Sequence, residues 1–465
     1  MKKVVIIGAG SIVFTQGLVM DIISHLGESN PCGDGDPRGG SVELALCDID
    51  PHALSVIERL VKKIMSAKGT NLTITADTDR KKLLPGAEYV VCTIGVGGRK
   101  AWEHDVLIPR KYGIYQPVGD TTMPGGISRA MRMIPALLDI LADVKAICPE
   151  AFVFNYANPM TVLTRAANKA TDIKMTGLCH GVIHTERYIA EALSLNPDKL
   201  TATSVGLNHL TFMYDIRYDG EDIKPHMHDF WKKNKNNLKR ALIGYEYCEE
   251  GQASEEGALE REPFSWEFFD RYDAFPAPGD RHITEFLTES FPEGMYFGNR
   301  LGFPGGYSFE ACIKHGDKEF ANMEFLASRD DPLPEEFFAA FAGEHEQLVD
   351  IITSIEGDRR KVYSVNLPNN GAVSNLPEFA VLEVPAVAAA NGFNALLISD
   401  FPDTLAGFIS RFIPAIEVTV EAALQGNREL FAEAILMGGY IRDHAAVSRM
   451  VDELLTVHKK FLPQF

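Results

Sequence analysis

Two short stretches carry side chains that could bind one divalent metal ion together. Cys179 and His180 lie in residues 176–184, and His209 ends the stretch Gly206-Leu207-Asn208-His209. A thiolate and an imidazole are both good ligands for divalent transition metals, and two protein ligands leave coordination positions open, as a catalytic site requires. Taken alone, however, the two residues are better explained as an ordinary buried thiol and a hydrogen-bonded core histidine.

A glycine-rich turn near the start of the chain predicts a dinucleotide site. Residues 3–7 have the apolar, β-branched pattern of a buried parallel strand, and Gly8-Ala9-Gly10-Ser11 follows at once. Residues 14–23 then continue with helical spacing. This order presents backbone N–H groups and a helix N-terminus to a pyrophosphate. The motif is incomplete, because Val13 stands where glycine or alanine is expected.

Further candidate cofactor residues lie at the ends of two other predicted strands. Near the end of residues 42–50 lies Asp48, whose carboxylate could accept from a ribose diol, and Asp50 is the second choice. Residues 87–95 end in small residues that let the backbone approach a ligand. The predicted cofactor-binding residues are Gly8, Gly10, Ser11, Asp48, Thr93 and Gly95. The alternative is a doubly wound domain whose glycines serve only packing.

The pattern as a whole predicts an α/β protein in two parts. Residues 1–200 are expected to form a Rossmann-like doubly wound sheet, with further strands at 73–76, 151–160 and 174–178 and helices at 127–144, 161–170 and 184–194. Residues 201–465 are expected to form an α+β, largely helical second domain. It begins with a strand pair at 201–205 and 211–217 and holds helices at 336–355, 408–436 and 442–462.

Composition narrows the possible partners and compartments. With 45 basic and 64 acidic residues the net charge is −19, which disfavours a nucleic-acid partner. The seven cysteines show no paired short spacing, which favours a reducing, cytoplasmic location. We find neither a signal peptide nor an apolar run long enough to span a membrane, so no membrane association is expected.

Five separate motifs resemble those of glycoside hydrolase family 4, whose members depend on NAD and a divalent metal. The motifs are Gly8-Ala9-Gly10-Ser11, residues 118–127, residues 155–160, Cys179-His180-Gly181-Val182 and residues 206–209. Their order and spacing carry the resemblance, which covers nearly the whole chain. It implies a lactate/malate dehydrogenase-like N-terminal fold, NAD and Mn²⁺ as cofactors, and Cys179 and His209 as the metal ligands.

The resemblance also implies a redox route to hydrolysis. Hydride passes from the sugar C3 to NAD⁺, a base removes the acidified C2 proton, the glycosidic oxygen leaves C1, water adds, and the hydride returns to C3. Asn158 is then expected to bind sugar hydroxyls, and Asp120 to bind a hydroxyl or transfer a proton; its alternative role is a helix cap. His180 is the candidate for protonating the leaving oxygen.

The base and the sugar are less closely defined. Asp280, Tyr272 and His282, in that order, are rival C2 bases, and a simple turn is the alternative for residues 276–280. Arg281 could grip a substrate carboxylate with two parallel hydrogen bonds, or be an exposed partner of Asp280. Arg99 and Asn366 are further expected substrate residues. The resemblance favours an α-galacturonide as the substrate, with an α-galactoside or α-glucuronide as alternatives.

Two other functions compete with the glycosidase. A dehydrogenase of the lactate or malate type would share the N-terminal fold, and a nucleotide-binding protein without catalysis would keep the same glycines. Neither explains Cys179, His209, Asn158 and Asp120 together. The expected partner is a small-molecule glycoside, and the resemblance implies a homodimer or homotetramer.

Overall fold

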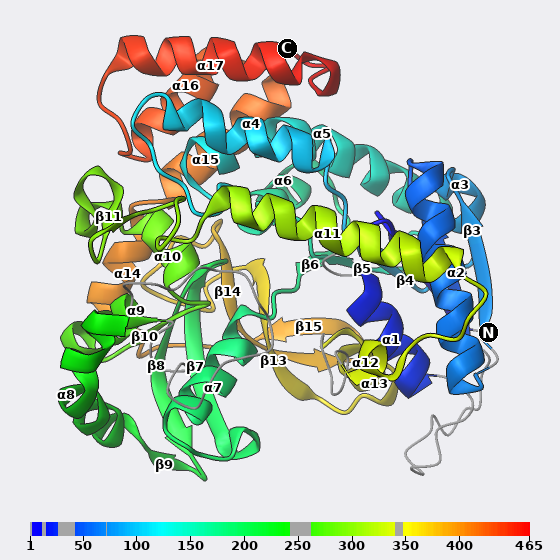
Figure 1. Cartoon of the computed structure of the whole chain (residues 1–465), viewed down its shortest axis with the longest axis horizontal. Helices are drawn as coiled ribbons and strands as arrows, with labels where there is room; N and C mark the ends of the chain where they lie inside the picture. Colours follow the sequence, from blue (N-terminus) through cyan, green and yellow to red (C-terminus); the bar gives the residue numbers. More distant parts are fainter. Residues whose placement is uncertain (1, 12–14, 27–41, 71, 242–261, 340–346) are drawn as a thin grey trace.

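The computed structural model describes residues 2–11, 15–26, 42–70, 72–241, 262–339 and 347–465 (Figure 1). Val13, which breaks the glycine motif, lies outside the described residues. Six parallel strands run in the order β6-β5-β4-β1-β2-β3. That is the strand order of a doubly wound dinucleotide-binding sheet, so the predicted fold class is confirmed. The strands are β1 (Lys2–Ile7), β2 (Val42–Cys47), β3 (Thr73–Asp77), β4 (Tyr89–Cys92), β5 (Phe152–Asn155) and β6 (Met175–Gly177).

Helices cover both faces of this parallel sheet. Alternate residues of β1 show the two faces: Val4 and Ile6 pack with α1, α2 and the later helix α13 (Leu348–Gly357), whereas Val5 and Ile7 pack with α5 and α6. Asp50, the second choice for a ribose contact, is instead the N-cap of α2 and accepts from the N–H groups of His52 and Ala53. The helices of this part are α1 (Thr15–Leu26), α2 (Pro51–Lys68), α3 (Arg80–Leu83), α4 (Gly98–Arg110), α5 (Met123–Ile147), α6 (Met160–Ala170) and α7 (Gly181–Ala192).

The same sheet continues as antiparallel strands after β6. The order is β6-β13-β14-β7-β8-β10, and the junctions are made by Asn366 opposite Gly177 and Glu383 opposite Gly206. A Cβ on Gly177 would lie 2.9 Å from that of Asn366, so glycine permits the close approach. The strands are β7 (Leu200–Leu207), β8 (Leu210–Tyr218), β10 (Phe275–Ala277), β13 (Lys361–Pro368) and β14 (Val381–Ala389), with β9 (Glu221–Asp222) and β15 (Gly392–Ala395) at the margins and a separate hairpin of β11 (Met295–Tyr296) and β12 (Asn299–Arg300).

Helices make up much of the remaining chain. They are α8 (Lys224–Ala241), α9 (Pro263–Tyr272), α10 (Asp280–Phe286), α11 (Phe309–Ser328), α12 (Glu335–Ala339), α13 (Leu348–Gly357), α14 (Asp403–Ser410), α15 (Ile413–Gln425), α16 (Arg428–Met437) and α17 (His444–His458). The helices predicted near 408–436 are α14, α15 and α16, and α15 is capped by Gly426, which adopts a left-handed conformation with φ 63°. Part of the predicted helix at 336–355 lies outside the described residues.

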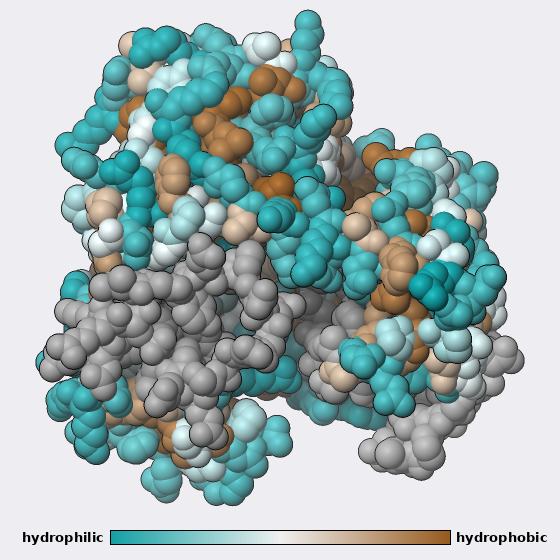
Figure 2. Space-filling model, in the orientation of Figure 1, coloured by the Kyte–Doolittle hydropathy of each residue, from teal (hydrophilic) through white to brown (hydrophobic). Residues whose placement is uncertain are grey.

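The last helices belong to the core of the first half. Helices α15, α16 and α17 lie against α4, α5 and α6 (Figure 1). Val420, Phe431 and Leu454 are buried in one cluster with Ile134 and Leu137 of α5. The hydrophobic core therefore crosses the predicted division at residue 200. No helix among the described residues is both long and apolar enough to cross a membrane, and Figure 2 shows hydrophilic residues interspersed with hydrophobic patches on one face.

Candidate functional site

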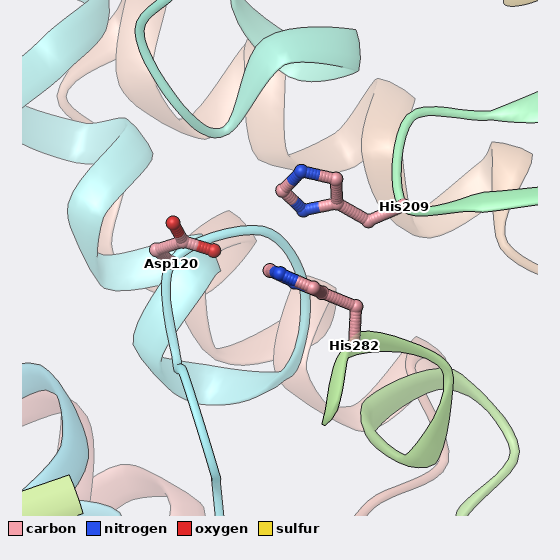
Figure 3. A group of neighbouring side chains, drawn as sticks. All are labelled: Asp120, His209 and His282. Carbon is pink, nitrogen blue, oxygen red and sulfur yellow. The ribbon is translucent and has the colours of Figure 1, made fainter. Parts of the chain in front are cut away.

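Three side chains from distant parts of the chain meet as a possible metal site. Asp120 lies in the loop before α5, His209 in the two-residue turn between β7 and β8, and His282 in the first turn of α10. Their ligand atoms all lie within 4.8 Å of one another, and the side chains point toward one another (Figure 3). The two imidazole rings have centroids 4.0 Å apart. One carboxylate oxygen and two imidazole nitrogens suit Mn²⁺ and other divalent transition metals.

A hydrogen-bond chain holds this group in place. The Thr121 hydroxyl donates to Oδ1 of Asp120 at 2.6 Å and is 2.7 Å from Nδ1 of His209. Because the hydroxyl has one proton, Nδ1–H of His209 then donates to Thr121, which leaves the lone pair on Nε2 for a ligand. The other carboxylate oxygen of Asp120 accepts from Nδ2 of Asn158 at 2.9 Å. Thr121 is thus a site residue that was not predicted from the sequence.

Burial keeps both histidines of the group neutral. It lowers the pKa of His209 to about 4, with Asp120 opposing the shift and His180 adding to it. The pKa of His282 is also lowered, by burial first and then by His209, Arg281 and His180. Nδ1 of His282 is buried and has no hydrogen-bond partner among the described residues. A neutral imidazole with an unused nitrogen is the state in which histidine binds metal.

The predicted ligand Cys179 is not one of these three residues, although its neighbour His180 lies near them. Cys179 lies two residues before the start of α7, is half-buried, and its sulfur accepts from the N–H of Gly181 at 3.4 Å. A Cβ on Gly181 would come within 2.9 Å of Pro278, so the glycine lets the segment before His282 approach Cys179. His180 is close enough to influence the pKa of His209 and His282.

The three rival bases lie in different surroundings. Asp280 is fully buried, and its oxygens accept from the N–H groups of Phe264 and Ser265 and from the hydroxyls of Ser265 and Tyr296 at 2.6 to 2.8 Å. These contacts cap the start of α9, and burial raises the pKa of Asp280 to about 6. Tyr272 is 38% exposed and packs on Phe268 and Phe408. His282 is in the possible metal group.

The predicted substrate residues lie in different parts of the structure. Asn158 lies at the metal group, and its Oδ1 is buried without a hydrogen-bond partner among the described residues. Arg281 is next to His282 and donates from Nη2 to the sulfur of Cys312 at 3.0 Å. Asn366 is buried in β13, at the junction with β6. Arg99, in contrast, forms an ion pair with Asp317 of α11 on the surface.

The predicted cofactor residues gather at the carboxyl ends of β1, β2 and β4. Gly8 has φ +94°, and a Cβ there would lie 2.7 Å from the Thr93 carbonyl carbon. The Thr93 hydroxyl donates to the Gly8 carbonyl at 2.9 Å, and Gly10 N–H donates to Asp48 at 2.8 Å. Ser11 N–H donates to the Gly8 carbonyl. Gly8 and Gly10 are the two positions at which only glycine fits, as a turn that receives a pyrophosphate requires.

Two ionisable residues behind the site, half-buried Arg129 and buried Glu285, carried no sequence signal. Arg129 of α5 donates from Nε to the Asn158 carbonyl at 3.0 Å, and its Nη2 is 3.8 Å from where a Cβ on Gly95 would lie. It thereby lies between the predicted cofactor and substrate residues. Glu285 of α10 accepts from the N–H groups of Val118 and Gly119, both at 2.7 Å, and so supports the loop that carries Asp120. Only the folded chain brings these partners together.

Comparisons with known proteins show the family of the chain. Residues 3–195 match the model described as family 4 glycosyl hydrolase, and residues 204–438 match that of its C-terminal domain. An α-galactosidase of Rhizobium meliloti is 30% identical, covering 100% of this chain and 89% of its own. An α-galacturonidase of Thermoanaerobacterium saccharolyticum is 28% identical, covering 98% and 95%.

Solved structures share the fold over most or all of the chain. A 6-phospho-α-glucosidase from gut microorganisms, in complex with NAD and Mn²⁺, has a TM-score of 0.82 at 18% identity and covers 100% of this chain and 99% of its own. Cryptosporidium parvum malate dehydrogenase has a TM-score of 0.51 at 15% identity and covers 91% and 99%.

Proposed function

The chain belongs to family 4 of the glycosyl hydrolases, and we propose that it hydrolyses α-glycosides with NAD⁺ and a divalent metal ion, Mn²⁺ first, as its cofactors. Relatives named α-galactosidase and α-galacturonidase support the α-glycoside class. NAD and Mn²⁺, the cofactors predicted from the sequence, are the ligands named for the 6-phospho-α-glucosidase that shares the fold. α-Galacturonides are the proposed substrates, with α-galactosides and α-glucuronides as alternatives.

The observation that carries the proposal is the Asp120, His209 and His282 group joined to Asn158. A carboxylate and two neutral imidazoles face one point, and the adjacent Asn158 holds a buried acceptor without a partner among the described residues. Buried polar atoms are rarely left unpaired, so Oδ1 of Asn158 is suited to accept a hydrogen bond from a sugar hydroxyl.

When bound, NAD⁺ would take up and return a hydride, and the metal would act as a Lewis acid toward sugar oxygens. The protein's own residues provide position and charge. Thr121 and Asn158 orient Asp120 and His209, and Arg129 holds the Asn158 carbonyl. His180 stays the proposed donor of a proton to the leaving oxygen. Asp280, Tyr272 and His282 stay alternatives for the C2 base, His282 only where it is not a metal ligand.

The metal ligands themselves need a choice between two sets. His209 belongs to both the predicted pair with Cys179 and the group of three. We assign Asp120, His209 and His282 to the metal from the positions of their ligand atoms, and keep Cys179 as a proposed soft ligand beside them. Either set leaves positions for substrate oxygens.

The test is hydrolysis of a nitrophenyl α-galacturonide with NAD⁺ and Mn²⁺ added together or singly. We expect coloured nitrophenolate without net NADH, and only when both cofactors are present. Nitrophenyl α-galactoside and α-glucuronide in parallel assays decide the sugar. Steady NADH production from a hydroxyacid, with no nitrophenolate from any glycoside, would instead support the dehydrogenase. The proposed homodimer or homotetramer is measured by light scattering.

A further inference from the structure

The loop that follows β4 contacts helix α5 and the C-terminal segment of the chain. Nε of Arg132 donates to the Val96 carbonyl at 2.8 Å, and Val96 N–H approaches the sulfur of Met133 at 3.3 Å. Gly97 has φ +83°, and a Cβ there would lie 2.8 Å from Cε2 of Phe461. Residues 95–97 are therefore fixed by α5 and by the C-terminal end of the chain.

Arg132 is itself fixed by a buried ion pair. Its Nη1 and Nη2 donate to the two oxygens of Asp105 at 2.9 and 2.5 Å, and both side chains are completely buried. Asp105 lies on α4 and also accepts from the Ser128 hydroxyl at 2.8 Å. Burial would raise the pKa of Asp105, but the charge of Arg132 and the hydrogen bond from His458 outweigh it and lower the pKa.

The C-terminal helix completes this network. Nε2 of His458, the last residue of α17, is 2.9 Å from Oδ1 of Asp105, and the His458 side chain is 2% exposed. Three residues later, Phe461 lies against Gly97. Two side chains of one short segment, His458–Phe461, thus act on the same loop: one through Asp105 and Arg132, the other by direct contact.

A buried ion pair is a poor way to gain stability, because desolvation offsets most of the attraction between the charges. This ion pair instead fixes the orientation of the Arg132 guanidinium. Each Nη of Arg132 is occupied by Asp105, so Nε is held toward the Val96 carbonyl. Removing the His458 contact weakens the constraint on Asp105, and removing the Phe461 ring opens space behind Gly97.

We propose that His458 and Phe461 are positioning residues for the dinucleotide, acting on residues 95–97 from the C-terminal end of the chain. The proposal rests on the proposed function, because it requires that this loop borders bound NAD⁺. It adds a role for the end of the chain, which supplies no predicted cofactor contact of its own.

The experiment measures the Kd for NAD⁺ by calorimetry and the Kd for Mn²⁺ by electron paramagnetic resonance, without substrate. His458→Ala and Phe461→Ala should each raise the NAD⁺ Kd about tenfold or more and leave the Mn²⁺ Kd within about twofold. His458→Gln, which retains a side-chain N–H donor, should recover part of the NAD⁺ affinity. The control is Glu453→Gln, which removes a contact from α17 to Lys111 and Tyr112 of the α4 region and should change neither Kd.

The outcomes distinguish a failure of the proposed function from a failure of the positioning role. If wild-type protein does not bind NAD⁺, the proposed function fails and this inference fails with it. If wild-type protein binds NAD⁺ and the folded His458 and Phe461 variants bind it equally well, only the positioning role is wrong. Equal losses of NAD⁺ and Mn²⁺ affinity would also overturn it, because they indicate general loosening. If His458→Ala does not fold, His458→Gln and Phe461→Ala decide the question.

Discussion

His209 combines an unusual backbone with an unusual side-chain environment. Its φ of 68° is the left-handed conformation that the tight turn between β7 and β8 requires, and few residues other than glycine adopt it readily. Strained backbone of this kind is most often retained at functional sites. Here it aims a buried, neutral imidazole at Asp120 and His282.

His282→Ala separates the two candidate ligand sets. If the group of three binds the metal, removing one imidazole should weaken Mn²⁺ binding by at least about 10–100-fold, the loss typical even of supporting groups around a metal. Mn²⁺ titration by electron paramagnetic resonance measures this. His444→Ala, at the exposed start of α17, is the control. Unchanged affinity in His282→Ala with lost affinity in Cys179→Ser would restore the Cys179 and His209 pair.

Arg281 allows a prediction about the sugar. It follows Asp280 and precedes His282, so its guanidinium belongs to the helix turn that carries a proposed metal ligand. Arg281→Ala should lower kcat/KM for an α-galacturonide by the equivalent of about 2–5 kcal/mol, and far less for an α-galactoside, because only the uronide has a carboxylate to pair. Equal losses on both substrates would end the carboxylate role.

At the level of elements, α10 supports the Asp120 loop through a buried acid. Burial raises the pKa of Glu285 from 4.5 to about 8, although the N–H groups of Val118 and Gly119 lower it. In the folded protein Glu285 therefore retains its proton at neutral pH, and its carbonyl oxygen can accept both N–H groups. The helix and the loop are joined without placing a second negative charge beside Asp120.

Stability should therefore depend on pH through Glu285. Between about pH 4.5 and 8 the folded state binds a proton that the unfolded state has lost, so the free energy of unfolding falls as pH rises, by at most about 1.4 kcal/mol per pH unit. Glu285→Gln should flatten this decline in urea unfolding measured across that range. Glu289→Gln, which removes only a half-exposed pair with Arg411, should leave the slope unchanged. An unaltered slope in Glu285→Gln would contradict the assignment.

The positions of the strands were predicted from the sequence better than the side-chain contacts of the site. All six parallel strands and the β7–β8 pair were located from the sequence, because continuous β-branched runs bounded by turns are local signals. The predicted strand at 87–95 ends at Cys92 in the structure, and Asp50 is a helix cap. Thr121, Arg129 and Glu285 were missed, because their roles depend on partners that are distant along the chain.

At the level of the whole molecule, the end of the chain completes the core of its beginning. Helices α15–α17 pack on α4–α6, and one sheet runs from β3 through the parallel strands to β10. Sequence patterns gave no indication of this, since amphipathic helices bury an apolar face without specifying the partner. The shared core implies that the two halves unfold together.

Leu454→Ala tests whether the two halves of the chain unfold together. The side chain is fully buried on α17, and its truncation should cost about 2–5 kcal/mol of unfolding free energy. Circular dichroism and tryptophan fluorescence, the latter including Trp266 in the second half, should report coincident transitions for wild type and variant. Val457→Ala on the same helix, 38% exposed, is the control and should cost much less. Two separated transitions would show that the halves unfold independently.

We propose that the glycosidic bond is cleaved by elimination at C2, and hydrogen exchange at C2 tests this step. The enzyme, with NAD⁺ and Mn²⁺, hydrolyses an α-galacturonide in D₂O, and the released sugar is analysed by NMR and mass spectrometry. Removal of the C2 proton before water addition predicts one solvent deuteron at C2 of the product. A product formed at full rate with hydrogen retained at C2 would contradict the account, because direct displacement at C1 leaves the C2 bond intact.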